Sequence, residues 1–575
     1  MPRSWLILVF ALSAAAAVAR SATVEHTFNV RTLSLPRVCQ PGNISITAVN
    51  GRVPGPKIEA NEGDTVVVHV INDCPYNVTV HWHGVFQRGT PWADGPSMVT
   101  QCPIRPGHAY TYRFNVTGQD GTLWWHAHSL FLRATVHGAL IIRPRRGAGA
   151  YPYPKPDEEK TVLLGEWWDA RNGDFFIGSS LGSADAYTIN GKPGDFYDCH
   201  TTPNRIAKFE VRRGSTYLLR IINAALNTAF FFKVASHTFT VVAADASYTT
   251  PYETDVIVIA PGQTVDALMV ANASQGCYYM VISSYQSAFP LRPGSFNANV
   301  TTAVVEYVGA APSEQHAPAL PAMPELTDTT TANRFYTSLT SLVRPDKPTV
   351  PLDVDTRMFV TVGLGFSSCD PAQKSCRGTA GGVAASMNNE SFALPTAISM
   401  LDARYRNTPA GVYTRDFPDQ PPVVFDYANV TKNVVGSSAA TLSSTGSPST
   451  KVRALRYNAT VEMVLQNTAL VGRESHPMHL HGFNFFVLAQ GFGNYDGATA
   501  AEQFNLVNPQ ERNTVAVPTG GWAVIRFVAN NPGMWFMHCH IDAHLAIGLA
   551  MVFEVEDGPT PDTALPPPPP DLPKC

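Results

Sequence analysis

Gly533-Met-Trp-Phe-Met-His-Cys-His-Ile-Asp-Ala-His544, close to the C-terminal end of the chain, is the stretch that decides the fold. On either side of it, residues 522–528 and 549–555 are rich in Val, Ile and Phe, a composition typical of β strands. Successive side chains of a strand point to opposite faces. We therefore expect Cys539 to face one way and the two histidines beside it to face the other. One thiolate and two imidazoles in this arrangement predict two metal sites joined by a single residue.

Length and charge limit the classes of protein that the chain can belong to. Its 575 residues are too many for one hydrophobic core and predict roughly three or four domains. The formal net charge is only −4, and no run of Lys or Arg forms a basic stripe. A nucleic acid is therefore not expected as a partner.

Residues 1–22 have the features of a cleaved secretory signal. A positive start, Met-Pro-Arg-Ser, precedes an apolar run over residues 5–18 and small residues near 19–22. A membrane span would need about 20 apolar residues and different flanks. Asn-x-Ser/Thr sequons, which fit a glycosylated surface, occur at Asn43, Asn77, Asn115, Asn272, Asn299, Asn389, Asn429 and Asn458. We therefore expect the protein to be secreted, with no membrane partner.

The nine cysteines predict a disulfide framework beside the metal site. Cys539 is assigned to the metal. The other cysteines are even in number and, in a secreted chain, are expected to form disulfides, although sequence alone does not give the pairing. Cys369 and Cys376 could close a small loop. Cys575 is the last residue, after a run of prolines, and a tie back to the body of the protein would fix this tail.

Short β-type runs separated by turn signals predict an all-β protein built from sandwiches or barrels. They occur at 44–49, 65–70, 78–83, 109–116 and 139–143, and again at 161–164, 217–222, 238–242, 256–259, 265–270 and 278–283. We predict domains over residues 23–145, 160–310 and 346–558, a connector over 311–345 and a Pro-rich tail over 559–575. The Ser/Thr/Gly-rich stretch 436–450 is expected to be a mobile loop within the third domain.

Three further histidine clusters join the one around Cys539. They are His81-Trp-His83, His126-Ala-His128 and His476-Pro-Met-His479-Leu-His481, and with His544 the four clusters hold ten of the 17 histidines. A single His-x-His pair is more often an ordinary half-buried pair than a metal site. Four such clusters predict metal binding, because imidazole suits copper, zinc, iron and nickel. A shared site requires the first and third domains to pack together.

The ratio of cysteine to histidine favours copper over zinc. Structural zinc sites are usually closed by two or more cysteines, whereas here one cysteine stands among ten histidines. Two histidines, one cysteine and a weak or absent axial group define a blue-copper electron-transfer site, and His476, Cys539 and His544 supply that set. The other eight histidines suffice for three more coppers, which could bind dioxygen and reduce it by four electrons.

The order and spacing of these clusters resemble those of the multicopper oxidases over essentially the whole mature chain. Trp124-Trp-His-Ala-His128, Leu132-Arg-Ala-Thr-Val-His-Gly138, Gly165-Glu-Trp-Trp168, Asp185-Ala-Tyr-Thr-Ile-Asn-Gly191 and His476-Pro-Met-His-Leu-His-Gly482 resemble plant laccases in particular. The resemblance implies three cupredoxin-like Greek-key domains and four copper ions. It also implies disulfides between Cys102 and Cys575 and between Cys39 and Cys199, and leaves Cys74 and Cys277 without a recognised partner.

The resemblance assigns the copper ligands residue by residue. It implies a type 1 copper at His476, Cys539 and His544, and a type 2 copper at His81 and His479. Of the type 3 pair, it implies one copper at His83, His126 and His540 and the other at His128, His481 and His538. The axial position of type 1 falls on Leu549, an apolar residue that should raise the reduction potential. Met551 has the same strand parity and would compete only if the register slipped.

The same resemblance points to residues that handle protons and substrate. Asp94 and Asp542 match the carboxylates that laccases place near the trinuclear centre, although Asp94 before Gly95 also fits a turn. The substrate is expected to lose its electron at the exposed edge of His544. Fungal laccases use an acidic residue of the second domain as proton acceptor, and Asn227 stands at that position here. Glu474 is the substitute that we predict.

These observations predict a secreted laccase that acts as a monomer in the apoplast or cell wall. It is expected to oxidise phenols, including monolignols and other lignin-related phenols, while reducing dioxygen to water. A metallo-oxidase acting on Fe(II) or Cu(I) would favour acidic or Met-rich clusters, and only 13 methionines are spread along the chain. An ascorbate oxidase is disfavoured by Leu549. A non-enzymatic cupredoxin protein of the same fold would lack copper ligands that this chain has.

Overall fold

The computed structural model describes most of the chain. The described residues are 21–38, 41–145, 151–169, 184–196, 205–286, 300–310, 317–345, 349–367, 383–428, 444–445, 448–468 and 474–575. Several predictions lie outside them: the bulk of the signal segment, the cysteines Cys39, Cys199, Cys369 and Cys376, and the sequons at Asn299 and Asn429. Of the other sequons, Asn389 is half-buried and the remaining five asparagines are exposed.

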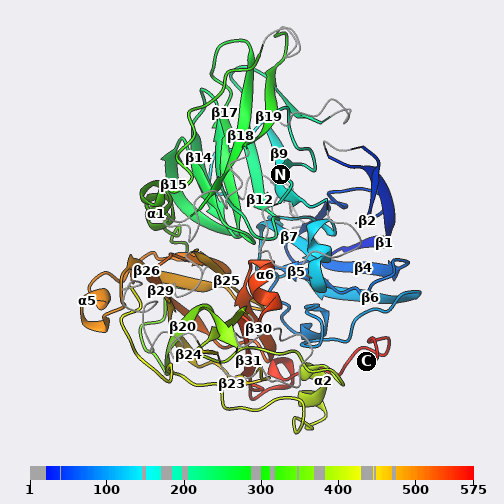
Figure 1. The fold of residues 1–575 in the computed structure, drawn as a ribbon, viewed down its shortest axis with the longest axis vertical. Coiled ribbons are helices and arrows are strands. Elements are labelled where there is room, and N and C mark those ends of the chain that lie inside the picture. Colours follow the sequence, from blue (N-terminus) through cyan, green and yellow to red (C-terminus); the bar gives the residue numbers. More distant parts are fainter. Residues whose placement is uncertain are drawn as a thin grey trace, which may run out of the picture.

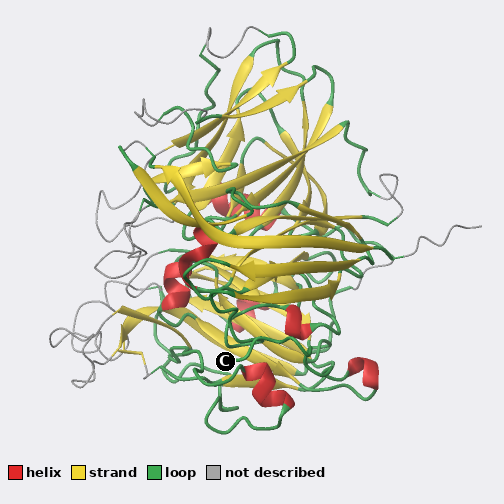
Figure 2. Ribbon diagram, turned by 90° about the vertical axis from the view of Figure 1, so that its right-hand side faces the viewer, coloured by secondary structure: helices red, strands yellow, loops and turns green. Residues whose placement is uncertain are grey.

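Within the described residues, six β sheets, arranged as three pairs along the chain, form the body of the protein (Figures 1 and 2). The strands of successive pairs fall within residues 23–143, 158–307 and 356–555. The all-β prediction is therefore confirmed, while the exact domain boundaries stay predictions. The second pair stands above the other two, and all three meet near the middle of the molecule (Figure 1).

The first pair of sheets packs β2-β1-β4-β6 against β3-β8-β7-β5. Alternation along β5 and β7 is what shapes its interior: Trp82 and Trp125 enter the core, while His81 and His126 take the other face. The strands are β1 (Thr23–Pro36), β2 (Asn43–Val49), β3 (Ile58–Asn61), β4 (Thr65–Asn72), β5 (Val80–His83), β6 (His108–Asn115), β7 (Gly121–Ala127) and β8 (His137–Arg143), with 3-10 helices η1 (Pro91–Ala93) and η2 (Leu130–Ala134).

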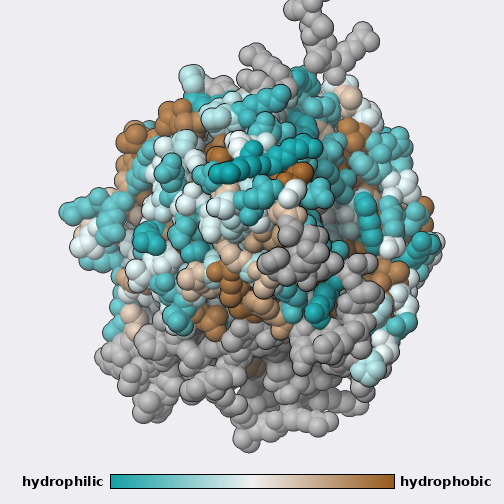
Figure 3. All heavy atoms as spheres, turned by 90° about the horizontal axis from the view of Figure 1, so that it is seen from above, coloured by the Kyte–Doolittle hydropathy of each residue, from teal (hydrophilic) through white to brown (hydrophobic). Residues whose placement is uncertain are grey.

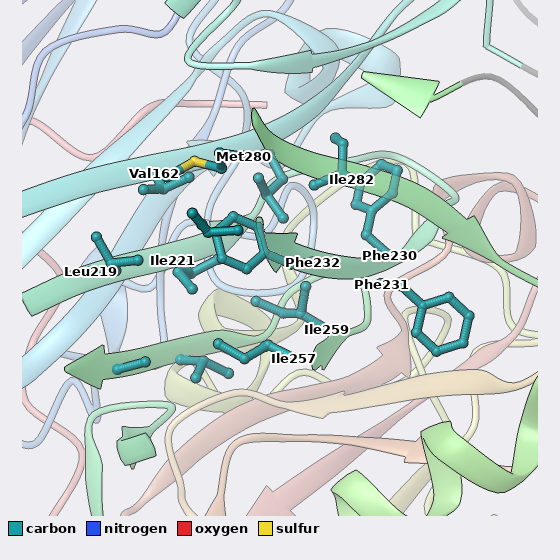
Figure 4. Close-up of a cluster of buried hydrophobic side chains, with 14 of the residues drawn as sticks. Val162, Leu219, Ile221, Phe230, Phe231, Phe232, Ile257, Ile259, Met280 and Ile282 are labelled. Carbon is teal, nitrogen blue, oxygen red and sulfur yellow. The ribbon is translucent and has the colours of Figure 1, made fainter. Parts of the chain in front are cut away.

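The second pair packs β10-β9-β12-β17-β14-β15 against β11-β19-β18-β13-β16. Its core gathers aliphatic and phenylalanine side chains from both sheets, as Figure 4 shows for Phe232, Ile221 and Ile259. The strands are β9 (Glu158–Trp167), β10 (Ala186–Ile189), β11 (Ala207–Val211), β12 (Thr216–Asn223), β13 (Ala229–Val234), β14 (Phe239–Ala244), β15 (Ser247–Thr254), β16 (Ile257–Ile259), β17 (Thr264–Val270), β18 (Cys277–Tyr285) and β19 (Val300–Tyr307). Strand β7 of the first domain contacts β12 and β17.

The third pair packs β21-β20-β24-β29-β26-β27 against β23-β31-β30-β25-β28. Its strands are β20 (Thr356–Ser367), β21 (Val383–Met387), β22 (Ser444–Thr445), β23 (Val452–Leu455), β24 (Thr460–Asn467), β25 (His476–Leu480), β26 (Phe485–Phe492), β27 (Gln510–Arg512), β28 (Thr514–Val517), β29 (Gly521–Val528), β30 (Gly533–Cys539) and β31 (Ala550–Val555). Its helices are α2 (Met400–Tyr405), α5 (Gly497–Ala501) and α6 (Asp542–Ala546). Short β22 pairs with β20 inside the stretch 436–450, where we predicted only a mobile loop.

The segments that join and end the domains carry structure of their own. The connector contains helix α1 (Thr329–Ser338), which its composition did not predict; the Asp328 side chain caps it by accepting the Thr331 amide at 2.9 Å. The tail beyond β31 contains η4 (Pro561–Thr563). It is fixed by the predicted Cys102–Cys575 disulfide, which is present with the two Cα atoms 5.1 Å apart. Cys74, by contrast, is a buried free thiol.

The surface is mixed in polarity. Viewed from the end that the second domain forms, polar side chains alternate with several separate apolar groups among the described residues (Figure 3). This pattern is ordinary for a folded protein surface. No helix in the described part of the chain is both long enough and apolar enough to span a membrane.

His137 gives a pH-dependent test of this packing. It is 5% exposed on β8, and burial lowers its pKa from 6.5 to about 4. Below pH 6.5 the unfolded chain takes up a proton that the folded chain does not, so stability falls as the pH falls towards 4. Between pH 7 and 4.5 the His137→Gln variant should therefore lose about 2 kcal/mol less stability than the unsubstituted chain. Denaturant titrations at each pH measure this, and parallel curves for the two proteins would contradict it.

Candidate metal centre

Strand alternation in β25 and β30 separates the metal-binding side chains into two sets. Cys539 shares the third-domain core with Met478 and Leu480, whereas His538 takes the opposite face of β30. On β25, His476 lies on the same face as Met478, whereas His479, and His481 just after the strand, lie on the opposite face. We call His476, Cys539 and His544 the Cys539 set. The histidine set comprises His81, His83, His126, His128, His479, His481, His538 and His540.

The Cys539 set is compact and almost inaccessible. The donor atoms of its three residues all lie within 4.8 Å of one another. The Cys539 Sγ lies 3.8 Å from His476 Nδ1 and 3.5 Å from His544 Nδ1. Pairing of Met478 with Cys539 brings β25 to this point, and α6 turns the chain back so that His544 returns to the sulfur. Each of the three residues is at most 1% exposed, so the prediction of an exposed edge on His544 was wrong; the neighbouring Glu474 is the residue that reaches solvent.

The histidine set lies where the first and third domains meet. The strand register brings two pairs of these histidines together: His81 pairs with His126 across β5 and β7, and His479 pairs with His538 across β25 and β30. Three overlapping groups have all donor atoms within 4.8 Å: His81, His83 and His126; His81, His479 and His481; and His128, His481 and His538. His540 joins them through its Nε2, 3.2 Å from His83 Nδ1.

Hydrogen bonds to one ring nitrogen turn the other towards the centre of the set. Backbone carbonyls accept from Nδ1 of four histidines, leaving Nε2 as the lone-pair nitrogen: Asp94 O for His81 (2.7 Å), Ala127 O for His126 (3.0 Å), Asn513 O for His479 (2.8 Å) and Cys539 O for His538 (2.9 Å). His83 is reversed, because its Nε2 donates to Asn513 Oδ1 at 3.1 Å and its Nδ1 faces His540. Such outer partners fix the tautomer of metal-bound imidazoles.

Buried nitrogen atoms without partners test whether the residues fit a metal. Nε2 of His81, His126 and His479 is buried and has no hydrogen-bond partner among the described residues. An unpaired buried polar atom is costly, and a metal ion would satisfy these three. The donor chemistry, with imidazoles throughout and one thiolate, fits copper. The residues therefore fit the metal.

Burial keeps most of these histidines neutral, the form that binds metal. It lowers the pKa of His476 and of His538 to about 3, and holds that of His83 well below its ordinary value. His544 differs: burial alone would lower its pKa, but Glu474 and Cys539 beside it raise the pKa to about 10. A metal entering the Cys539 set therefore displaces a proton from His544.

Asp94 lies against two histidines of the set and is fully buried. Its Oδ2 accepts from His481 Nδ1 at 2.9 Å, and its backbone oxygen accepts from His81. The chain turns sharply at Gly95, whose φ is +97° and where a Cβ would lie 1.9 Å from Val80 O. Only glycine therefore allows the approach that brings Asp94 to the histidines.

Asp542 lies beside a buried arginine that the sequence did not predict as part of the site. Arg133 Nη2 lies 3.5 Å from the Asp542 carboxylate and donates to the carbonyls of Leu226 and His540, each at 3.0 Å. Burial raises the pKa of Asp542, and Arg133 opposes that rise. Arg133 thus joins all three domains. Its position in the motif 132–138 was the only sign of it in the sequence.

Asn227 and Glu474 take different places around His544. Asn227 Oδ1 accepts the Ala543 amide at 3.3 Å, so its side chain holds the start of helix α6, which carries His544. Its own loop is anchored by Glu166, which accepts the amides of residues 226 and 227. Glu474 contacts the imidazole directly, with Oε1 3.0 Å from His544 Nε2, and its side chain is 43% exposed.

Leu549 lies opposite Cys539 in the sheet. His538 pairs with Ala550 in the antiparallel β30–β31 register, so the next position brings Leu549 to Cys539, whose amide donates to Leu549 O at 3.1 Å. Met551 instead pairs with Met537. The register thus places Leu549, and not Met551, across from Cys539.

Comparison with known proteins places the chain in a family. Residues 34–147, 158–310 and 416–559 each match a family described as multicopper oxidase. The chain is 74% identical to Laccase-6 of Oryza sativa subsp. japonica, with all of both chains covered. It is 54% identical to Laccase-7 of Arabidopsis thaliana, covering all of this chain and 99% of the other. The chain therefore belongs to the multicopper oxidase family and, within it, to the plant laccases.

A solved structure supports the same conclusion at the level of the fold. The laccase from Botrytis aclada superimposes with a TM-score of 0.68 at 27% identity, covering 95% of this chain and 89% of that one. This likeness confirms the predicted fold of three cupredoxin-like domains. Membership of this family implies copper, the metal that the donor atoms of the two sets fit.

Asp94 gives a test of how the centre is oriented. In the Asp94→Ala variant His481 loses its Nδ1 acceptor, and we expect copper affinity to fall by about 10- to 100-fold, as is usual for such outer partners. Equilibrium dialysis against copper measures this. Asp94→Asn keeps an acceptor oxygen and should stay closer to the unsubstituted protein. Unchanged affinity in the alanine variant would contradict the orienting role.

Proposed function

We propose that this protein is a secreted laccase with four coppers that oxidises phenols and reduces dioxygen to water. The observation that carries the proposal is the position of Cys539. Its sulfur belongs to one ligand set, and the residues on either side of it, His538 and His540, belong to the other. Electrons collected at the first set therefore have a path of a few covalent bonds to the second.

The assignment of ligands follows the groups described above. The type 1 copper is assigned to His476, Cys539 and His544, and the type 2 copper to His81 and His479. The type 3 pair is assigned to His83, His126 and His540, and to His128, His481 and His538. Bound copper would supply one-electron transfer from the substrate and four-electron transfer to dioxygen.

Residues of the chain supply the proton chemistry. A phenol that loses an electron also loses a proton, and the half-exposed Glu474 stands at the edge of His544 where that proton would be released. We assign it the part that an acidic residue of the second domain has in fungal laccases, since Asn227 is occupied with the backbone of Ala543. Asp94, which contacts His481, and Asp542, which lies beside Arg133, are assigned to proton delivery for water formation.

Location and substrate class follow from the plant relatives and the sequence. We assign the protein to the apoplast or cell wall, as a glycosylated monomer, on the strength of the signal segment and the sequons. Lignin-related phenols, such as monolignols, are the proposed substrates, with roles in lignin polymerisation, lignin degradation or detoxification of its products. Leu549 beside Cys539 favours a high-potential site suited to phenols over an ascorbate oxidase.

Oxygen uptake by the purified protein tests the activity. Uptake should be faster with a monolignol than with ascorbate or Fe(II), and faster rates with either of these would overturn the laccase assignment in favour of its alternatives. The Cys539→Ser variant should lose both its blue colour and its turnover, because the thiolate defines the type 1 site. Retained oxidase activity in that variant would refute the proposed electron path.

Glu474 can be tested by comparing two kinds of electron donor. In Glu474→Gln the amide cannot take up the phenol proton, so turnover with phenols should fall by at least about tenfold. Turnover with a non-phenolic donor that loses only an electron should stay unchanged, because it needs no proton acceptor. Stopped-flow oxidation of both donors over a range of pH measures this. An equal fall with both donors would assign Glu474 to the copper site itself.

A further inference from the structure

A two-residue turn in the second domain lies against both of the other domains. Asp245 and Ala246 connect β14 to β15, and both have positive φ, +48° and +59°. This is the two-residue hairpin turn in which Asn-Gly or Asp-Gly is favoured, because L side chains rarely adopt such φ values. Alanine at the second position is therefore unusual, and the contacts that the turn makes on both sides hold it in place.

The Asp245 carboxylate is buried and accepts four hydrogen bonds. Oδ2 accepts from Arg512 Nε at 3.0 Å and from the Thr514 amide at 3.3 Å. Oδ1 accepts from Arg512 Nη2 at 3.2 Å and from the Thr264 amide at 2.9 Å. Asp245 is 1% and Arg512 is 2% exposed. The pair is thus a bidentate bridge between the second and third domains, fully removed from solvent.

The segment that Asp245 holds is the one that orients two histidines of the metal centre. Asn513 O accepts from His479 Nδ1 at 2.8 Å, and Asn513 Oδ1 accepts from His83 Nε2 at 3.1 Å. Thr514 Oγ1 lies 3.1 Å from His479 Nδ1 and 3.2 Å from His83 Nε2. One residue therefore separates the aspartate bridge from both imidazoles.

The other half of the turn contacts the first domain. A Cβ on Gly121, at the start of β7, would lie 2.8 Å from the Cα of Ala246. Thr264, which donates its amide to Asp245, also donates its hydroxyl to Thr122 O at 2.7 Å. Strand β7 continues to His126. The turn is thus placed between the strand that carries His126 and the segment that orients His479 and His83.

We propose that Asp245 is a positioning residue for the metal centre, through which the second domain sets the orientation of His479 and His83. This inference rests on the proposed ligand set. None of the histidine groups in the described part of the chain includes a residue of the second domain. His237, buried within that domain, bonds Ala235 O and Tyr307 instead. The turn is therefore one of the routes by which the second domain reaches the centre, beside Leu226 O, which accepts from Arg133, and Gln263, which donates to Thr514 O at 3.0 Å.

The test compares Asp245→Asn with a matched control. Asparagine keeps the size and the turn preference of aspartate but removes the charge that fixes Arg512. Glu462→Gln removes a similarly buried carboxylate from Arg526 within the third domain, away from the histidine-orienting segment. Copper content, the blue absorbance of the Cys539 set and the electron paramagnetic resonance spectrum of the type 2 copper are recorded for each variant.

We expect Asp245→Asn to bind the type 2 copper about 10- to 100-fold more weakly and to change its resonance spectrum, with the blue absorbance retained. Glu462→Gln should leave both signals unchanged. Arg512→Lys keeps the charge but loses the bidentate geometry, and it should change the type 2 spectrum in the same direction. This variant replaces Asp245→Asn in the test if Asp245→Asn does not fold. A type 2 spectrum and affinity identical to those of the unsubstituted protein in either folded variant would overturn the proposal. Absence of copper from the unsubstituted protein would instead refute the proposed function.

Discussion

The alternation of side chains along β30 is the constraint on which the rest of the site depends. It points the Cys539 side chain into the core of the third domain, beside His476 and His544, and points the His538 side chain towards the interface with the first domain. Neither set could be moved by one residue without exchanging the thiolate for an imidazole. The two sets are therefore fixed relative to each other by covalent geometry, at the shortest separation that a strand allows.

Burial of so many imidazoles would be unfavourable without partners for their ring nitrogens. Backbone carbonyls of Asp94, Ala127, Asn513 and Cys539 satisfy one nitrogen on each of four rings and leave the other facing inward. Desolvation keeps most of the rings neutral, so their lone pairs are available to metal. The same low-dielectric surroundings that favour metal binding also demand the charge pairing seen at Arg133 with Asp542 and at Asp245 with Arg512.

The parts that could be predicted from sequence are those with a local pattern. Runs of β-type residues between turn signals located fewer than half of the described strands, and the His-x-His pairs and Cys539 located the two sets, because these signals lie within a few residues of one another. The sequence did not predict Arg133, Asn513 or Asp245 as parts of the centre. Each acts across a domain interface on a residue hundreds of positions away, and each looks locally like an ordinary turn or strand residue. Helix α1 was missed because the Ala- and Pro-rich segment and the polar stretch after it indicated a connector, although Asp328 caps the start of the helix.

Packing of all three domains against one another converts these separate signals into one centre. The first domain contributes the histidines between residues 81 and 128, and the third contributes the ligands between residues 476 and 544. The second domain holds the segments at Ala543 and Arg512 that help to position these ligands. The most direct test is a crystal structure with anomalous difference maps measured on both sides of the copper absorption edge. Four copper peaks are expected, one within His476, Cys539 and His544 and three within the histidine set. Fewer peaks, or copper bound outside these two sets, would contradict it.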